Sequence, residues 1–268
     1  MSIVQAIILG AVQGLTEFLP ISSSGHLIFI PKIFGWSDQG LSFDIVVHLG
    51  TLLAVIVYFR KKIMNILKSF FKKDLSANKN RRLGIILFFS IVPAGIFGLL
   101  ASGWIENSLR SSGVVAFGLI FWGLILIGAD VYAKKSGKKL KDLKNISNKQ
   151  AILISFVQAI ALIPGTSRSG ITMTGGLFSG LDKKTAAEFS FLMSIPIILL
   201  AGMLGIYDLL SLGVENIDFY TLIAGFITSL LSGLAAIWIL MKVIQKWNFK
   251  PFGVYRILVG LLIIIFLA

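Results

Sequence analysis

The chain has 268 residues, of which 56% are hydrophobic and 14% are charged, and its mean hydropathy is +0.90. Apolar side chains in this proportion exceed what a soluble core of this size buries, so the composition excludes an ordinary soluble protein and predicts a single integral membrane domain over 1–268. The formal charge of +13 would suit nucleic acid, but the basic residues gather in short links between apolar runs, as in cytoplasmic loops of membrane proteins, which argues against that partner. Cysteine is absent, which excludes a disulfide framework and a thiolate metal site.

The first apolar stretch, 1–31, is broken near its middle by a proline and a run of serines, QGLTEFLPISSSGH. It predicts a broken, re-entrant helical hairpin rather than a plain span. A second stretch of this kind, 150–181, carries PGTSRSGIT. Six other runs are long enough to cross a hydrocarbon layer of about 30 Å, which takes roughly 20 helical residues. These six predicted transmembrane helices lie near residues 43–59, 83–102, 114–133, 188–206, 219–241 and 252–268.

The links between the predicted spans differ in charge. Nine Lys or Arg residues lie in 60–82 and seven in 134–149, which predicts that both links are cytoplasmic. The links 103–113 and 207–218 contain one Lys or Arg between them, Arg110, and are predicted to face outside. With this orientation the first broken hairpin enters the membrane from the outer face and the second enters from the cytoplasm.

The two broken hairpins match one another in their polar positions. Without a gap, an offset of 145 positions places Gln5 on Gln150. The same offset aligns Gln13 with Gln158, Ser22 with Ser167, Ser24 with Ser169, and Gly25 with Gly170. A duplicated polar segment that enters from opposite faces predicts an inverted-topology repeat, with repeat one at about 1–133 and repeat two at about 150–268. The alternative is two ordinary helical hairpins, each with a kink.

The first repeat supplies acid and hydroxyl groups. Gln13 and Glu17 lie four residues apart on one helix face, where an amide oxygen and a carboxylate could hold a divalent cation, Mg²⁺ or Ca²⁺. Ser23 is a candidate attacking hydroxyl, and His26 is a candidate general acid, general base or nucleophile whose tautomer Glu17 would fix. The neighbouring residues expected to bind substrate are Ser22, Ser24 and Gly25.

The second repeat supplies an anion site. Arg168 lies in a glycine-flanked turn before a predicted helix, and a guanidinium together with the free N–H groups of a helix start suits phosphate. The residues expected to bind substrate here are Gly165, Thr166, Ser167, Ser169, Gly170 and Thr172. A lone charge at the bilayer centre costs about 2.5–3.5 kcal/mol or more, so Glu17 and Arg168 are expected to meet and form a phosphoryl-transfer site.

Other polar residues have simpler interpretations. Gln158 has no acidic neighbour of its own and is interpreted as a helix-packing amide. His48 and Asp44 lie four residues apart at the start of a span, which favours interfacial helix pairing. Asp130 is expected to pair with the lysines at 134–135.

With these motifs identified, the chain resembles the bacterial undecaprenyl-diphosphate phosphatase family, the bacitracin-resistance type of membrane phosphatase. QGLTEFLPISSSGH is similar to the family's pattern of Glu or Gln, three residues, then Glu and a serine-rich turn, and PGTSRSGIT is similar to its Pro-Gly-x-Ser-Arg-Ser-x-x-Thr pattern. In length and hydropathy the resemblance covers essentially the whole chain. Many members carry Glu at the position of Gln13, and a neutral amide binds a cation less strongly. The functional positions that the resemblance implies are Gln13, Glu17, Ser23, His26, Ser167, Arg168 and Thr172.

The resemblance implies removal of the terminal phosphate from undecaprenyl diphosphate, which recycles the lipid carrier for cell-wall synthesis. It also implies a divalent cation and a multi-pass protein of the bacterial plasma membrane whose site opens toward the outer face. Membrane lipids and a second copy of the chain, in a homodimer, are further expected partners.

Three mechanisms remain open at this stage: attack on the terminal phosphorus by Ser23, by His26, or by water activated by His26. The competing class is a membrane transporter or lipid flippase, because inverted repeats with loops at the midplane build many carriers. A third class is a lipid-binding protein without catalysis. The combination of Glu17, His26 and Arg168 favours the phosphatase, because a carrier needs reversible binding but no activated nucleophile.

Overall fold

The computed structural model describes residues 1–72, 75–109, 111–137, 142–212 and 218–267. These residues form helices and turns with no β-strand among them, which confirms the predicted all-α class. In chain order the elements are α1 (Ile3–Phe18), α2 (Ser23–Phe34), α3 (Leu41–Tyr58), α4 (Arg60–Ser69), α5 (Leu75–Phe89), α6 (Ile91–Ser108), α7 (Ser112–Lys135), the 3-10 helix η1 (Leu143–Asn145), α8 (Asn148–Ala159), η2 (Ile160–Leu162), α9 (Arg168–Phe178), α10 (Lys183–Leu212), α11 (Phe219–Val243) and α12 (Lys250–Leu267).

Within the described ranges, five helical stretches are long and apolar enough to cross a membrane, judged by length and composition. Each coincides with a predicted span, and they are Leu41–Tyr58, Ala77–Ala101, Ser112–Lys135, Lys183–Ser211 and Phe219–Val243. The second of these stretches is interrupted, because α5 ends at Phe89 and α6 begins at Ile91. The sixth predicted span, 252–268, lies on the 18-residue helix α12, and its crossing stays a prediction.

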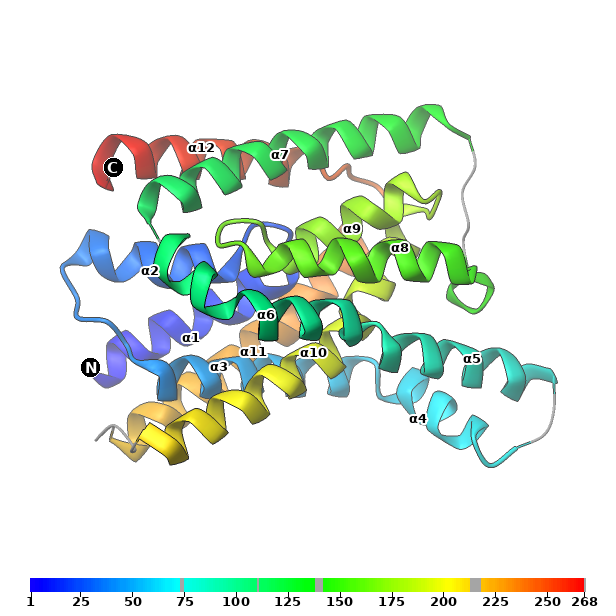
Figure 1. The fold of residues 1–268 in the computed structure, drawn as a ribbon, viewed down its shortest axis with the longest axis horizontal. Helices are drawn as coiled ribbons and strands as arrows, with labels where there is room; N and C mark the ends of the chain where they lie inside the picture. Colours follow the sequence, from blue (N-terminus) through cyan, green and yellow to red (C-terminus); the bar gives the residue numbers. More distant parts are fainter. Residues whose placement is uncertain (73–74, 110, 138–141, 213–217, 268) are drawn as a thin grey trace.

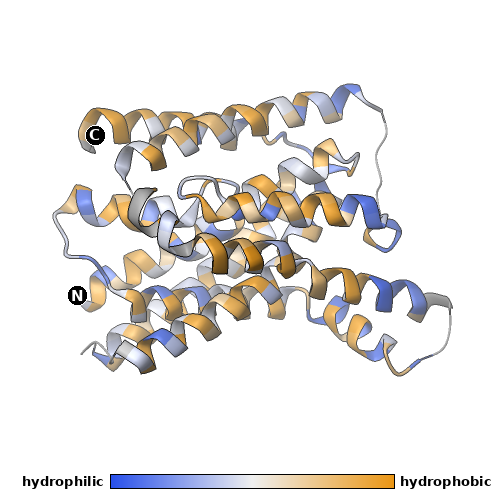
Figure 2. Cartoon of the chain, viewed as in Figure 1, coloured by the Kyte–Doolittle hydropathy of each residue, from blue (hydrophilic) through white to orange (hydrophobic). Residues whose placement is uncertain are grey.

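The long helices run roughly side by side along one axis (Figure 1). The ends of α4, α5, α7 and α8 that flank the two basic links gather at one end of the bundle, and Figure 2 shows polar residues concentrated there. The ends of α6, α7, α10 and α11 that flank the two predicted outer links lie at the opposite end. The arrangement thus separates the two basic links from the two links that are poor in Lys and Arg, as their charges predict. Arg110 and Glu215, which belong to the predicted outer links, lie outside the described residues.

The first helix of each broken hairpin begins and ends with the same signals. Ser2 and Gln5 form a capping box at the start of α1, and Ser147 and Gln150 form the equivalent box at the start of α8. The backbone N–H of each glutamine donates to the serine hydroxyl at 3.2 Å. Both helices end shortly before a Leu-Pro or Ile-Pro pair, where the residue before proline is driven out of the helical conformation. The repeat therefore fixes the same local structure twice.

Helix α1 lies against α11 through small residues. A Cβ atom placed on Gly14 would lie 1.9 Å from Ser232 Oγ and 2.4 Å from Ser229 O, and one placed on Gly10 would lie 2.2 Å from Thr228 Oγ1. Such contacts let two backbones approach closely, which is how helices associate where the surroundings are as apolar as the side chains. The approach fixes α1, and therefore Glu17 near its end, against the bundle.

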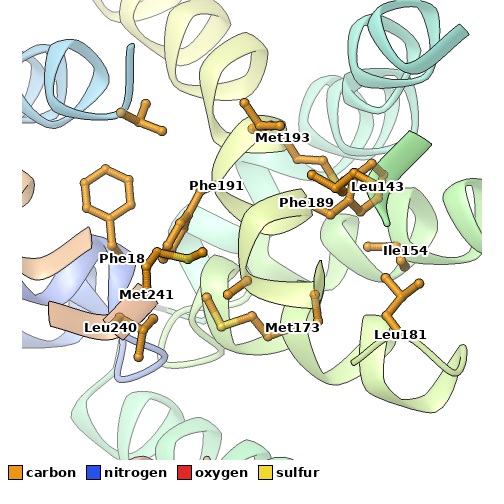
Figure 3. Packing of buried hydrophobic residues seen from close by; sticks show 14 of the residues in the cluster. Phe18, Leu143, Ile154, Met173, Leu181, Phe189, Phe191, Met193, Leu240 and Met241 are labelled. Atoms are coloured by element: carbon orange, nitrogen blue, oxygen red, sulfur yellow. The ribbon is translucent and has the colours of Figure 1, made fainter. Parts of the chain in front are cut away.

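A hydrophobic cluster surrounds the end of α1 (Figure 3). Phe18 is fully buried, and its ring meets the edge of Phe191 on α10 with centroids 5.4 Å apart and planes at 86°. Met173 on α9 and Leu240 on α11 belong to the same cluster. Edge-to-face pairs of this kind add about 0.5–1.5 kcal/mol beyond the area that they bury. The cluster holds α1, α9 and α10 together directly beside Glu17.

Candidate active site

Two strained turns, one in each repeat, define the site. Ser22 has φ 76° and Ser167 has φ 69°, and they are the non-glycine residues with positive φ in the part of the chain that the structure describes. Each serine directly precedes a helix, α2 or α9. A serine in such a conformation costs on the order of 1–3 kcal/mol, and such residues cluster at functional sites. The predicted break in each hairpin is confirmed, and the same offset of 145 relates the two turns.

The two turns meet in space. Arg168 Nη2 donates to Glu17 Oε1 at 2.7 Å, and Ser169 Oγ donates to the carbonyl oxygen of Leu19 at 3.0 Å. Arg168 also donates through Nη1 to the carbonyl of Ser190 on α10 at 3.1 Å. The prediction that the acidic group of one repeat pairs with the basic group of the other is confirmed. Each charge neutralises the other where neither could be exposed to hydrocarbon.

The carboxylate of Glu17 is a hydrogen-bond centre. Its Oε2 atom accepts from the Ser23 hydroxyl at 2.6 Å and from the Gln13 side-chain nitrogen at 3.2 Å, while its Oε1 atom accepts from Arg168. Glu17 is 8% exposed. A serine hydroxyl within hydrogen-bond reach of a carboxylate, with that carboxylate oriented by a third group, is the geometry of an activated nucleophile.

A cavity of about 280 Å³ opens beside this cluster. Its polar lining comes from the two turns and from α1, α2, α3, α8 and α9, and the rest of its lining consists of small and aliphatic residues of α6, η2 and α10. The lining residues are Glu17, Ser22, Ser23, Ser24, His48, Ala94, Gln158, Ala161, Leu162, Ser167, Arg168, Ile197, Ile198 and Ala201. The hydroxyl groups and the guanidinium suit an anionic head group, and the aliphatic wall suits an apolar tail.

His26 is not placed as predicted. Its Nδ1 atom donates to the carbonyl of Ser22 at 2.7 Å, and its Nε2 atom accepts from the hydroxyl of Tyr255 at 2.8 Å. The rings of His26 and Tyr255 are nearly parallel, with an interplanar angle of 4°. The carbonyl of Ser22, and not Glu17, therefore fixes the tautomer, because a carbonyl can only accept. The expected contact between Glu17 and His26 is wrong, and His26 is absent from the residues that line the cavity.

The predicted substrate-binding residues divide into two groups. Ser22, Ser24 and Ser167 line the cavity. Several others make hydrogen bonds within the protein: the Thr172 hydroxyl donates to the carbonyl of Arg168 at 2.8 Å, and Gly170 N donates to Ser167 Oγ at 3.1 Å. Substrate contact stays a prediction for the whole set. The predicted residues absent from the cavity lining are Gln13, Gly25, Gly165, Thr166, Ser169, Gly170 and Thr172.

Two secondary expectations need revision. Asp130 pairs with Lys183, with Oδ1 and Nζ 3.3 Å apart, and not with the lysines at 134–135, because α7 lies next to the start of α10 in the bundle. Gln158 is a packing amide as predicted, since its nitrogen donates to the carbonyl of Ser90 at 3.2 Å, but it also lines the cavity.

Sequence reasoning missed two residues near the site and interpreted a third, His48, only as an interfacial partner of Asp44. His48 Nδ1 donates to the backbone carbonyl of Asp44 at 2.7 Å, while His48 also lines the cavity and its Nε2 atom lies 4.0 Å from Glu17 Oε2. Tyr255 on α12 contacts His26 at the start of α2, and Arg256 on α12 contacts the backbone just before the second turn. The signal for Arg256 was present, because an arginine inside an apolar run is functional by default, but nothing in the sequence indicated which turn it would reach.

The fold and the site together define a membrane-embedded protein with a serine, a carboxylate and a guanidinium grouped around a half-polar cavity. The family described as "Bacitracin resistance protein BacA" matches residues 6–262 of the chain. The chain belongs to this family, as the two motifs had indicated.

Curated relatives are similar over their whole length. Undecaprenyl-diphosphatase 1 of Pseudoalteromonas translucida (strain TAC 125) is 46% identical over 272 residues, which covers 100% of both chains. Undecaprenyl-diphosphatase 2 of Stutzerimonas stutzeri (strain A1501) is 43% identical over 99% of this chain and 98% of its own. Undecaprenyl-diphosphatase of Hahella chejuensis (strain KCTC 2396) is 45% identical over 97% of this chain and 96% of its own.

Proposed function

We propose that the protein hydrolyses undecaprenyl diphosphate, releasing phosphate and undecaprenyl phosphate. The observation that carries the proposal is the cluster in which Ser23 donates to Glu17 at 2.6 Å and Arg168 binds the same carboxylate at 2.7 Å. The family and the full-length likeness to undecaprenyl-diphosphatases support the same activity. A carrier or flippase is not favoured, because reversible binding does not need a hydroxyl held against a buried base.

In the mechanism that this geometry supports, Ser23 attacks the terminal phosphorus while Glu17 takes its proton. A bond forms between Ser23 Oγ and phosphorus, and the bond from phosphorus to the bridging oxygen breaks, so that the lipid monophosphate leaves. A water oxygen then bonds to the phosphorus of the phosphoserine while the bond between Ser23 Oγ and phosphorus breaks. The proton held by Glu17 returns to Ser23 Oγ, so that phosphate is released and both the hydroxyl and the carboxylate are restored. Arg168 compensates charge on the equatorial oxygens in both steps. Of the three mechanisms left open by the sequence, attack by Ser23 has the geometric support.

A divalent cation, Mg²⁺ or Ca²⁺, is part of the proposal. The described residues contain no group of three His, Cys, Asp or Glu that could hold a metal, so most ligands would come from water and the diphosphate, as is usual for Mg²⁺. Glu17 and Gln13 would hold it: the oxygen of the buried Gln13 amide has no hydrogen-bond partner among the described residues, and rotation of the amide would turn this oxygen toward Glu17. When bound, the cation would neutralise charge on the diphosphate.

The proposed topology has six transmembrane helices and two re-entrant hairpins in an inverted repeat. Five helices of spanning length, the equivalent strained turns and the separation of the basic links from the links poor in Lys and Arg support it. The basic links would face the cytoplasm, and the cavity would open toward the outer face of the bacterial plasma membrane. The proposal also includes a homodimer of the chain.

The test is phosphate release from a long prenyl diphosphate by the purified protein in detergent. Wild type should release phosphate, a chelator should suppress the release, and Mg²⁺ or Ca²⁺ should restore it. The Ser23→Ala variant should be inactive, whereas Ser211→Ala, an exposed serine on α10, should match wild type. No phosphate release from the wild type with either cation, together with translocation of labelled lipid in vesicles, would show a carrier instead.

A further inference from the structure

Helix α12 contacts residues next to both strained turns through two consecutive side chains. The Tyr255 hydroxyl donates to His26, which lies in α2 four residues after Ser22, at 2.8 Å. Arg256 Nη2 donates to the carbonyls of Gly165 and Thr166, just before the second turn, at 2.9 and 2.8 Å. Tyr255 is 229 positions from His26 in the sequence, and Arg256 is 91 and 90 positions from Gly165 and Thr166. These contacts therefore exist only in the folded chain.

The first of these contacts continues into the turn itself. His26 accepts a hydrogen bond from the Tyr255 hydroxyl at Nε2 and donates one from Nδ1 to the carbonyl of Ser22 at 2.7 Å. Ser22 has the positive φ of 76°, and Ser23 directly follows it. The strained conformation persists only if its surroundings over-determine it. The imidazole thus links the turn that aims the Ser23 hydroxyl to a distant helix.

The second contact, made by Arg256, also lies next to a strained turn. Arg256 is fully buried, and the carbonyls that it binds precede Ser167, the other residue with positive φ. Its Nε and Nη1 atoms have no hydrogen-bond partner among the described residues, so the hydrogen bonds of Nη2 to the backbone next to this turn are what hold the buried guanidinium. A Cβ atom on Gly165 would lie 2.4 Å from the carbonyl of Val115, which shows how closely the turn lies against α7.

We infer that Tyr255 and His26 are positioning residues that hold the turn at Ser22 and thereby direct the Ser23 hydroxyl to Glu17. His26 acts through its two hydrogen bonds and not as an acid or base, because both ring nitrogens are engaged and the ring is absent from the cavity wall. The inference rests on the proposed function, in which Ser23 is the nucleophile.

The first experiment compares variants by steady-state phosphate release. Tyr255→Phe removes one hydroxyl and should lower kcat at least about tenfold, with KM changed less than about twofold, because the loss lies in the aim of the nucleophile and not in substrate binding. His26→Asn keeps an N–H for the Ser22 carbonyl and should lose less than about tenfold, whereas His26→Ala should lose about a hundredfold or more. Tyr220→Phe, an exposed tyrosine on α11, is the matched control and should equal wild type.

The second experiment measures the reactivity of the Ser23 hydroxyl without the lipid substrate. A fluorophosphonate should label Ser23 of wild type and Tyr220→Phe at one rate and label Tyr255→Phe several-fold more slowly. In ¹⁵N spectra, Tyr255→Phe should move the Nε2 resonance of His26 and leave His48 unchanged. Because the chain contains two histidines, His48→Gln assigns the signals.

The outcomes separate the inference from the function. Wild-type kcat and labelling in Tyr255→Phe would overturn the inference, and so would a His26→Asn variant as inactive as His26→Ala. If the wild type releases no phosphate, the proposed function fails, and the positioning of Ser23 is then decided by the labelling rates alone.

Discussion

At the scale of the residue, Glu17 collects three donors on one carboxylate: Arg168, Ser23 and Gln13. The structure changes its expected partner, since Ser23 and not His26 lies within hydrogen-bond reach. A group that accepts a proton from one neighbour while a guanidinium orients it is suited to general-base work. The chemistry of the site therefore depends on two short contacts rather than on the number of polar groups in the motifs.

The pairing of Glu17 with Ser23 predicts strong non-additivity. Ser23→Ala and Glu17→Gln should each lower phosphate release by about a hundredfold or more, because each removes the same proton transfer. The double variant should be little worse than the poorer single variant. Steady-state kinetics of the three proteins measure this directly, and losses in activation free energy that simply add would show that the two residues do not act together.

Substitution of Arg168 can separate the effect of its charge on turnover from the effect of its planar geometry. Arg168→Lys keeps the positive charge but loses the planar fork that binds Glu17 with one nitrogen and the Ser190 carbonyl with the other. Turnover should fall at least about tenfold, which is about 1.4 kcal/mol of transition-state stabilisation. The measurement is kcat in detergent, with the thermal midpoint as the check on folding. Turnover close to wild type would remove Arg168 from the mechanism.

At the scale of the element, the broken hairpins are built from signals that occur twice. A capping box lies at the start of α1 and of α8, and a proline follows the end of each of these two helices. A serine with positive φ then precedes the next α-helix, α2 or α9. The two hairpins differ in their charged residues: the carboxylate of Glu17 occurs only in the first, and the guanidinium of Arg168 occurs only in the second. The symmetric backbone brings two different functional groups to one place.

The contact of α1 with α11 predicts a packing effect on the site. Gly14→Val should destabilise the protein by about 1–3 kcal/mol, because the new side chain would meet the carbonyl of Ser229, which cannot rotate away. Gly128→Val is the control, since a Cβ atom at Gly128 meets nothing within 4 Å. Thermal unfolding in detergent compares the two variants. Equal midpoints would mean that α1 can shift without cost.

At the scale of the whole molecule, the charges of the links correspond to the two ends of the helix bundle. The helix ends next to the basic links gather at one end of the bundle, and those next to the links that are poor in Lys and Arg lie at the other end (Figures 1 and 2). The positive-inside rule then gives the orientation of the whole bundle.

Orientation can be tested with introduced cysteines, because the chain contains none. Cysteine at position 113 or 208 should react with an impermeant thiol reagent added to intact cells, whereas cysteine at 78 or 149 should react only after permeabilisation. The native residues Gly113, Asp208, Asn78 and Lys149 are all exposed, so access does not depend on unfolding. The opposite pattern would invert the proposed topology, and equal labelling at all four positions would indicate mixed insertion.

The sequence by itself determined the class, the motifs and the pairing of Glu17 with Arg168. Composition and charge pattern predict membrane helices because their lengths and loop charges follow from the bilayer, and the duplicated motif predicts two matched breaks because the same residues occur at each. It also determined five of the six expected spans as helices of spanning length.

Only the tertiary structure decided which side chains meet. The sequence assigned His26 to Glu17, placed His48 in an interfacial pair rather than in the site, and gave no role to Tyr255 and Arg256. A hydrogen bond between residues 229 positions apart depends on how α12 lies against the hairpins, and local pattern carries no information about that distance. The backbone breaks are set by local residue chemistry, whereas the direction of each side chain within the site is set by the packing of helices that are remote in sequence.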